Sequence, residues 1–179
     1  MRRIESMRKT AIIICLALLL AGCGDNNTDT SSGNSSTVAI TGASESIEGF
    51  EFIYNDLKIR PNGKAAPVIS SLGEAKNYFE SPSCAFSGVD KFYVYNSFEI
   101  NTYPKDGTDY IYIIKLLDDS VETKEGICIG DKFSEVKTAL PDDYEEKNGF
   151  YTYKRGKTNL EIIVVNDTIT DIKYIAITD

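Results

Sequence analysis

The sequence predicts an α+β fold in which two similar units in series form one antiparallel sheet with helices packed on one face. Two observations predict this fold. Helical and extended patterns follow one another in the same order twice along the chain, and short aromatic and aliphatic motifs recur at matching places in that order. Of the 179 residues, 42% are hydrophobic and 26% are charged, which is an ordinary composition for a globular protein.

Residues 1–22 are predicted to be a signal peptide and not part of the fold. A basic start, with Arg2 and Arg3, is followed by an apolar run of eleven residues, AIIICLALLLA. In a helix this run would rise about 16 Å, which is about half of the hydrocarbon core of a bilayer. The run is therefore too short for a membrane span and is typical of a signal peptide.

The run ends in Leu20-Ala21-Gly22-Cys23, which resembles the lipobox of bacterial lipoproteins. In that family the peptide is cut before the cysteine, and the cysteine receives acyl chains such as palmitate. The resemblance implies a lipid anchor on Cys23 and a location on the extracytoplasmic side of the cell membrane. The alternative is a simple secretory signal that is followed by an unrelated cysteine.

Residues 23–46 are predicted to be a flexible tether between the lipidated cysteine and the folded part. Positions 24–36 hold only Gly, Asp, Asn, Thr and Ser. Such a segment cannot bury enough apolar surface to offset the entropy lost on ordering.

Residues 47–125 form the first predicted unit. FEFIYNDLKI is interpreted as one strand, KAAPVISSLG as a short helix and EAKNYFES as a second short helix. Pro67 suits the first turn of the helix, and Gly73 suits the position after its end. Three extended runs follow, FYVY, SFEINTY and YIYIIKL, and Asp106-Gly107 predicts a tight hairpin between the last two.

Residues 126–179 form the second predicted unit, with the same order of elements. GICIGD is interpreted as a strand that leads into a helix capped by Asp131. Phe133, Val136 and Leu140 give this helix one apolar side. Three further extended runs then close the chain, FYTY, LEIIVV and ITDIKYIAI.

The internal repeat is carried by matched motifs. Positions 92–95 (FYVY) match 150–153 (FYTY), and 98–100 (FEI) match 160–162 (LEI). The alternative is chance, because such motifs are common in strands. A true repeat would make each unit supply the same set of strands.

This arrangement resembles the β-lactamase inhibitor protein family, which has two tandem units of helices and antiparallel sheet. The stretch GICIGDKFSEVKTALP resembles the units of the small outer-membrane assembly lipoproteins. The stretch from SCAFSGVDKFYVY to GICIGD resembles uncharacterised lipoproteins of Gram-positive anaerobes. The resemblance implies a sheet with helices on one face and a partner-binding face opposite. The inhibitor family also has a disulfide in each unit and Trp-rich contacts, whereas this chain has no Trp. The resemblance therefore does not imply that this chain binds the same partner as that family.

The composition excludes several kinds of chemistry. The chain has no His and a formal charge of −8. Without His there is no Ser-His-Asp or Cys-His catalysis and no His-bearing zinc site, and no phosphate-binding glycine motif occurs. We therefore expect no cofactor, no metal and no nucleic-acid partner, since an acidic chain repels phosphates.

The acidic pairs at 118–119, 142–143 and 145–146 are interpreted as solvated charges at turns.

Cys84 and Cys128 are the cysteines that remain after residues 1–22 and the lipidated Cys23 are set aside. Exported chains meet oxidising conditions, so these two residues could form a disulfide. The alternative is two free thiols. A catalytic cysteine is not expected, because no histidine is present to lower its pKa.

Tyrosine is the most suggestive residue type, with 11 Tyr against 8 Phe. Strand alternation places Phe92 and Val94 on one face of the sheet and Tyr93 and Tyr95 on the other. We expect the helices to cover the Phe face and the Tyr face to be open. The predicted binding face comprises Tyr93, Tyr95, Tyr103, Tyr110, Tyr112, Tyr151 and Tyr153. The alternative is that these rings stabilise the sheet through cross-strand pairs.

These observations predict a non-catalytic binding module that is held at the membrane and takes another exported protein as its partner. Inhibition of an exported enzyme is one form that such binding could take. The second hypothesis is a structural or assembly lipoprotein of the cell envelope. The third is a hydrolase of an envelope polymer, which would need converging carboxylates.

Overall fold

The computed structural model describes residues 48–178. The chain divides into two units, Met1–Gly42 and Ala43–Asp179, and all described residues belong to the second. The predicted signal peptide, the lipidation site Cys23 and the tether 23–46 lie outside the described residues and stay predictions.

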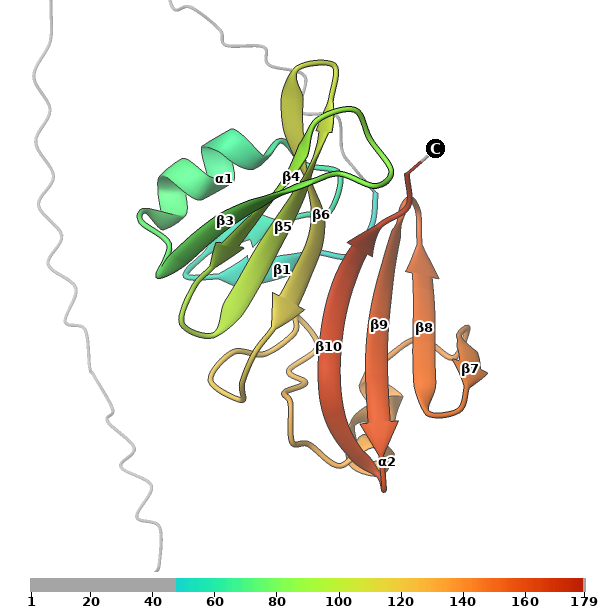
Figure 1. The fold of residues 1–179 in the computed structure, drawn as a ribbon. Helices are drawn as coiled ribbons and strands as arrows, with labels where there is room; N and C mark the ends of the chain where they lie inside the picture. Colours follow the sequence, from blue (N-terminus) through green and yellow to red (C-terminus); the bar gives the residue numbers. More distant parts are fainter. Residues whose placement is uncertain (1–47, 179) are drawn as a thin grey trace, which may run out of the picture. The chain divides into compact units, whose positions relative to one another are not determined.

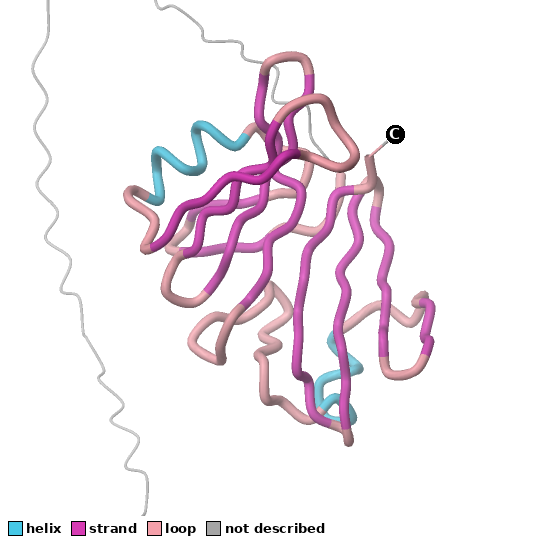
Figure 2. Tube along the Cα trace, in the orientation of Figure 1, coloured by secondary structure: helices cyan, strands magenta, loops and turns pink. Residues whose placement is uncertain are grey.

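Strands dominate the described part of the chain (Figures 1 and 2). The strands are β1 Phe52–Tyr54, β2 Leu57–Ile59, β3 Asn77–Pro82, β4 Val89–Val94, β5 Phe98–Lys105, β6 Thr108–Leu116, β7 Glu145–Lys147, β8 Phe150–Arg155, β9 Thr158–Val165 and β10 Thr168–Ala176. The helices are α1 Ala65–Leu72, α2 Phe133–Val136 and the 3₁₀ turn η1 Lys137–Ala139.

Eight of these strands form one antiparallel sheet in the order β3-β4-β5-β6-β10-β9-β8-β7. Each half of the sheet is a meander in chain order, and the two halves meet where β6 pairs with β10. The matched motifs FYVY and FYTY fall in or next to the equivalent strands β4 and β8, and FEI and LEI fall in β5 and β9. The strands β1 and β2 form a separate hairpin.

The predicted α+β fold of two helix-plus-sheet units with helices packed on one face is wrong, because the protein is mostly β. EAKNYFES does not form a helix. Most of it is strand β3, whose Tyr78 and Phe79 pair with Tyr93 and Phe92 of β4. The second helical pattern yields only one turn of α-helix followed by η1.

One hairpin turn and one helix form as predicted, and one predicted strand is divided. The Asp106-Gly107 hairpin is confirmed, with both residues at positive φ (51° and 72°). The helix with Pro67 in its first turn and Gly73 at its end is confirmed as α1. FEFIYNDLKI contains two strands and not one, because Asn55 and Asp56 both adopt positive φ and reverse the chain.

The prediction for residues 126–131, the segment before the second helix, is wrong in two respects. GICIGD forms turns and not a strand, with Gly126 and Gly130 at φ of 77° and 96°. Asp131 does not cap the helix, since its Oδ2 accepts the backbone N–H of Cys128 at 2.7 Å. Asp167, from the turn between β9 and β10, instead accepts the N–H of Ser134 at 2.9 Å.

One hydrophobic core lies against a single face of the sheet. The β1–β2 hairpin, α1 and α2 contribute Phe52, Ile59, Ala65 and Phe133 to it. The sheet contributes from both halves Phe98, Ile100, Ile111, Ile114, Leu116, Tyr153, Leu160, Ile162, Ile169, Ile172 and Tyr174. Both halves therefore share this core.

The start of the described chain is attached to the second half of the sheet. Gly49 forms a bridge with Gly156, and the N–H of Phe50 donates to Oγ1 of the buried Thr158 at 2.7 Å. Thr158 in turn donates to the carbonyl of Arg155 at 2.9 Å. The chain thus enters the fold beside the β8–β9 turn.

Candidate functional site

The tyrosines of β4 and β8 lie on the covered face of the sheet. Tyr93 and Tyr151 pack against the core, where they pair with the fully buried Ile100 and Ile162. Tyr153 has no exposed surface. The sequence correctly predicts that Tyr and Phe of these strands point to opposite faces, but the prediction that Tyr153 faces open solvent is wrong.

Ring contacts of Tyr95 and Tyr151 also lie on this covered side of the sheet. Tyr95 is half-buried, and its ring stacks on Phe98 at 5.0 Å. Tyr151 lies 4.2 Å from the ring of Phe133 in α2. Burial raises the pKa of Tyr95 and raises the pKa of Tyr153 to about 12, because a phenolate is costly in apolar surroundings.

Tyr103, Tyr110 and Tyr112 form a second aromatic group at the far end of β5 and β6. Tyr103 lies opposite Tyr110, with ring centroids 5.8 Å apart, and 5.9 Å from Tyr112. Phe86, from the loop between β3 and β4, lies 4.6 Å from Tyr103 and helps to bury it to 5% exposure. Tyr103 and Tyr110 alternate with the buried Thr102 and Ile111, so they lie on the face opposite the core. The predicted seven-tyrosine face is thus two clusters, and the tyrosines of β4 and β8 lie on the core side.

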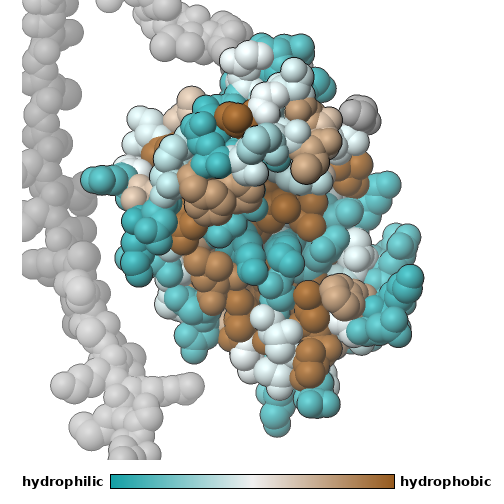
Figure 3. Space-filling view, viewed as in Figure 1, coloured by the Kyte–Doolittle hydropathy of each residue, from teal (hydrophilic) through white to brown (hydrophobic). Residues whose placement is uncertain are grey.

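The face opposite the core is here called the open face. Its residues alternate with the buried ones along each strand of the sheet. It comprises Phe79, Phe92, Val94, Glu99, Asn101, Ile113, Lys115, Phe150, Thr152, Lys154, Asn159, Glu161, Ile163, Asp171, Lys173 and Ile175, with Tyr103 and Tyr110 at its far end. In Figure 1 it is turned toward the viewer, with α2 behind the sheet. Figure 3 shows apolar and polar groups interleaved across it.

A row of charges crosses the middle of the open face. Glu99, Lys115, Lys173 and Glu161 lie side by side on β5, β6, β10 and β9. The carboxylate of Asp171 joins the row, with its oxygens 3.4 Å from Lys115 Nζ and 3.0 Å from Lys173 Nζ. The charges compensate one another, so the row offers directional contacts without a strong net field.

An apolar row runs beside the charges. Ile113 lies directly opposite Ile175 at the junction of the two halves, with Asn101 and Asn159 on either side. Phe92 and Phe79 extend this row toward the β3 edge, their rings stacked at 4.4 Å. Phe79 is 50% exposed, and Phe150, at the other end of the sheet, is 52% exposed.

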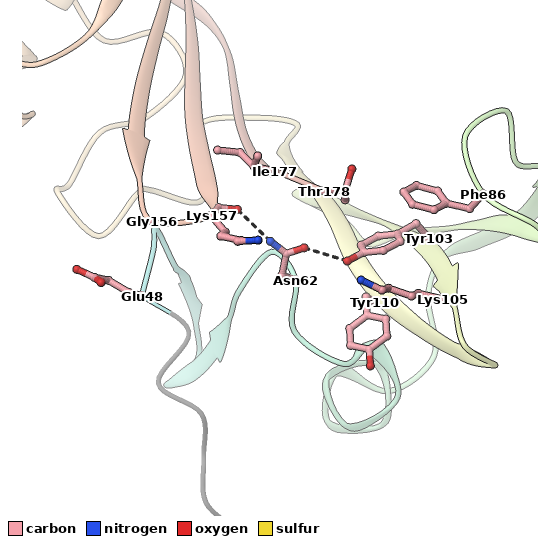
Figure 4. Close-up of a pocket in the computed structure, with 10 residues that line it drawn as sticks. All are labelled: Glu48, Asn62, Phe86, Tyr103, Lys105, Tyr110, Gly156, Lys157, Ile177 and Thr178. Carbon is pink, nitrogen blue, oxygen red and sulfur yellow. Dashed lines mark hydrogen bonds between the residues drawn. The ribbon is translucent and has the colours of Figure 1, made fainter.

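A hollow of about 590 Å³ lies at the end of the sheet where the halves diverge. Figure 4 shows the residues that line it. Asn62 joins the two halves there. Its Nδ2 donates to the carbonyl of Lys157, and its Oδ1 accepts the hydroxyl of Tyr103, both at 2.9 Å. Lys105 and Tyr110 also line the hollow. The lining also includes Lys157 and one carboxylate, Glu48. Aromatic rings beside two ammonium groups and one carboxylate suit a small anionic molecule, which makes the hollow a second candidate site.

Cys84 and Cys128 are free thiols in the structure. Cys84 is exposed in the loop after β3, and Cys128 is half-buried before α2. Burial, followed by the carboxylates of Asp131, Glu122 and Asp119, raises the pKa of Cys128. These surroundings make Cys128 a poor nucleophile.

The acidic pairs lie on separate elements. Asp118 accepts the backbone N–H of Ser120 at 2.9 Å, and Glu145 and Glu146 belong to β7. Asp143 and Glu145 line one surface hollow together with Lys154, and all three residues are exposed.

Within residues 48–178, no group of three or more His, Cys, Asp or Glu side chains is arranged to hold a metal ion. Over the same range, no helix has the length and apolarity needed to cross a membrane.

Comparisons of the chain with protein-family models, with curated proteins and with solved structures find no match. The lipobox and the resemblance to the β-lactamase inhibitor protein family therefore stay predictions.

The open-face residues Phe79, Ile113, Phe150 and Ile175 were not among the predicted site residues. Strand alternation was the available signal, since it groups Phe92 with Val94 and Ile113 with Lys115. That pattern separates two faces but does not say which one the remaining elements cover.

Proposed function

We propose that this protein is a lipid-anchored extracytoplasmic binding module that holds another exported protein against the open face without catalysing a reaction. The observation that carries the proposal is the pairing of half-exposed apolar side chains with a compensated charge row at the centre of the open face. The loop that carries Phe86 covers only the Tyr103 end of this face. Apolar side chains that gather on the surface of a monomeric protein, with polar groups around them, often mark a binding site. Interfaces combine such apolar centres with polar groups that fix orientation.

The membrane part of the proposal rests on residues outside the described range. Cys23 would carry the lipid, and residues 23–46 would let the sheet reach a partner near the membrane. A tether of this length has a mean reach of roughly 25 Å if flexible. A partner exported to the same side of the membrane would lie within this range.

A binding role fits the chemistry of the open face better than hydrolysis does. The face carries amides, aliphatic groups and ion-paired charges, and the whole chain has no histidine. Glycoside hydrolysis uses two carboxylates that flank a cleft. On the open face the nearest carboxylate to the central lysines, Asp171, is already held by Lys115 and Lys173.

The test is capture of a partner by the detergent-solubilised full chain, immobilised and exposed to the surface and secreted proteins of its host. The open-face variant is Ile113→Glu with Ile175→Lys. It removes the central apolar pair, keeps the net charge and places opposite charges opposite each other. The helix control is Ala66→Glu with Ser70→Lys, the same charges at an i, i+4 spacing on exposed positions of α1.

We expect the native chain and the helix control to capture one protein that the open-face variant does not capture. Equal capture by all three would contradict the open face as the site. If no protein is captured, the binding-module proposal fails, and the Tyr103–Lys105 hollow becomes the site to examine with small anionic molecules.

A further inference from the structure

The strand β3 is an uncovered edge of the sheet. All six of its residues are exposed, and it pairs only with β4. The opposite edge, β7, has three residues, all charged (EEK). Short and charged edges resist pairing with other strands. β3 is longer and less charged, since Glu80 is its one charged residue, and Tyr78 and Phe79 are about half exposed. Pro82 blocks pairing only at the last position of the strand.

The hydrogen bonds of the β3–β4 hairpin show which backbone groups of β3 point outward. The N–H of Ser83 donates to the carbonyl of Gly88 at 3.0 Å. Bonded and non-bonded pairs alternate along an antiparallel ladder, so Pro82, Glu80 and Tyr78 occupy non-bonded pairs. The missing N–H of Pro82 agrees with this assignment. The N–H and C=O groups of Tyr78 and Glu80 therefore point to the free edge.

The hydrogen bonds between β4 and β5 lead to the same assignment of inward and outward backbone groups on β3. The N–H of Tyr95 donates to the carbonyl of Phe98 at 2.9 Å, so Tyr95 and Tyr93 bond toward β5. Phe92 and Val94 then bond toward β3, where their partners are Phe79 and Asn77. This leaves the backbone groups of Tyr78 and Glu80 available to another strand.

We propose that β3 pairs antiparallel with β3 of a second copy of this chain, with the two Phe79 residues directly opposite each other. In this register Tyr78 of each copy lies opposite Glu80 of the other, and the pair exchanges two backbone hydrogen bonds on each side of the axis. The interface is two-fold symmetric and closed. It joins two eight-stranded sheets into one.

The side chains favour this register. Phe79 stacks on Phe92 at 4.4 Å with an interplanar angle of 6°, so pairing would extend the stack to four rings across the axis. Each Glu80, which already accepts the hydroxyl of Tyr78 in its own strand, would face a tyrosine of the other copy. A register centred on Glu80 would instead oppose two carboxylates, which is destabilising.

The charge of the edge also favours a second copy. The segment from Lys76 to Pro82 holds one lysine and one glutamate and has no net charge, whereas the whole chain carries −8. The segment itself therefore adds no net repulsion between two acidic copies that meet along this edge. The pairing uses a different surface from the centre of the open face, so it can succeed or fail independently of the proposed function.

Cysteine cross-linking in the full chain tests the register. Cys84 and Cys128 are changed to Ser, Phe79→Cys is introduced, and membranes are oxidised mildly with copper phenanthroline. The same background without Phe79→Cys accounts for any cross-link through Cys15 or Cys23. We expect a disulfide-linked dimer, because residues opposite in a non-bonded pair approach most closely. Phe150→Cys is the matched control, since Phe150 is 52% exposed against 50% for Phe79 and lies at the other end of the sheet. Tyr78→Cys tests the neighbouring register and should cross-link less.

Sedimentation over a concentration series gives a second measurement, on chains solubilised in detergent. Phe79→Glu places two carboxylates on the axis and should shift the chain to the monomer, and mixing Phe79→Glu with Phe79→Lys should restore the dimer. A native chain that stays monomeric would overturn the proposal and leave β3 to a strand of a different protein. Cross-linking of Phe150→Cys or Tyr78→Cys as complete as that of Phe79→Cys would also overturn it.

Discussion

Lys115 and Lys173 lie directly opposite each other on β6 and β10, at the junction between the two halves of the sheet. Like charges in this position repel. The carboxylate of Asp171 lies within 3.4 Å of one ammonium group and 3.0 Å of the other. Asp171 therefore allows two lysines to occupy the centre of the open face.

The first prediction concerns this carboxylate. Asp171→Asn keeps the shape of the side chain and removes the carboxylate that the two lysines share, which leaves only their cross-strand neighbours Glu99 and Glu161. We expect a loss of about 1 kcal/mol in the free energy of unfolding, since partly exposed ion pairs contribute on this scale. Urea denaturation measures the loss. The loss of unfolding free energy should be smaller in high salt, where the repulsion between the two lysines is screened. A loss that does not depend on salt would contradict this explanation.

The second prediction concerns the hydroxyl of Tyr153. This oxygen is buried and has no hydrogen-bond partner within the described residues. Removing an unsatisfied buried polar group costs little, so Tyr153→Phe should be as stable as the native chain or about 1 kcal/mol more stable. Tyr153→Ala should lose about 3–5 kcal/mol, because it leaves a cavity in the core.

Tyr103→Phe is the matched control for Tyr153→Phe. It removes the hydroxyl that donates to Asn62 Oδ1 at 2.9 Å and should cost about 1 kcal/mol. Chemical denaturation compares the three variants. A larger loss for Tyr153→Phe than for Tyr103→Phe would show that the Tyr153 hydroxyl has a partner.

The third prediction is the pH dependence of stability at alkaline pH. Burial raises the pKa of Tyr153 from 10.0 to about 12 in the folded chain, so the folded state favours the protonated phenol. This contribution is fully present below pH 10 and is lost as the pH rises toward 12. Unfolding measured across that range should show a fall in stability, and the fall should be smaller in Tyr153→Phe. An unchanged slope in the variant would contradict the assignment.

The fourth prediction concerns the two cysteines. Residues 43–179 contain only Cys84 and Cys128 and form a unit of their own. Cys84 is exposed, whereas burial and nearby carboxylates raise the pKa of Cys128. A thiol reagent at mildly alkaline pH should modify Cys84 at least about tenfold faster, and in urea the two rates should converge. Protection of both thiols until a reductant is added would show instead that they form a disulfide.

The sequence predicted most strands of the large sheet well, because their motifs carry strong local signals. FYTY, LEIIVV and ITDIKYIAI are rich in β-branched and aromatic residues, and Asp106-Gly107 supplies the left-handed conformation of a two-residue turn. β3 was missed because EAKNYFES has helix-forming residues at its start. Its strand conformation comes from pairing with β4, which is a tertiary effect that a local pattern does not contain.

The side of the sheet that carries the core could not be predicted from alternation alone. Phe92 and Tyr93 have rings of similar apolar area, and a tyrosine ring can be buried with its hydroxyl at the edge of the core. The deciding contacts come from distant residues, such as Phe133 of α2 against Tyr151. The candidate site therefore moved from the tyrosines of β4 and β8 to the face that carries Phe92, Ile113 and Ile175.

The most direct test of the open face is the affinity of the captured partner for three forms of the chain, measured by titration. The forms are the native chain, the Ile113→Glu/Ile175→Lys variant and the Ala66→Glu/Ser70→Lys helix control. Central apolar residues contribute most of the energy of an interface, so the open-face variant should bind at least about tenfold more weakly, with the helix control unchanged. Equal affinity of the native chain and the open-face variant, with both variants folded, would contradict the account.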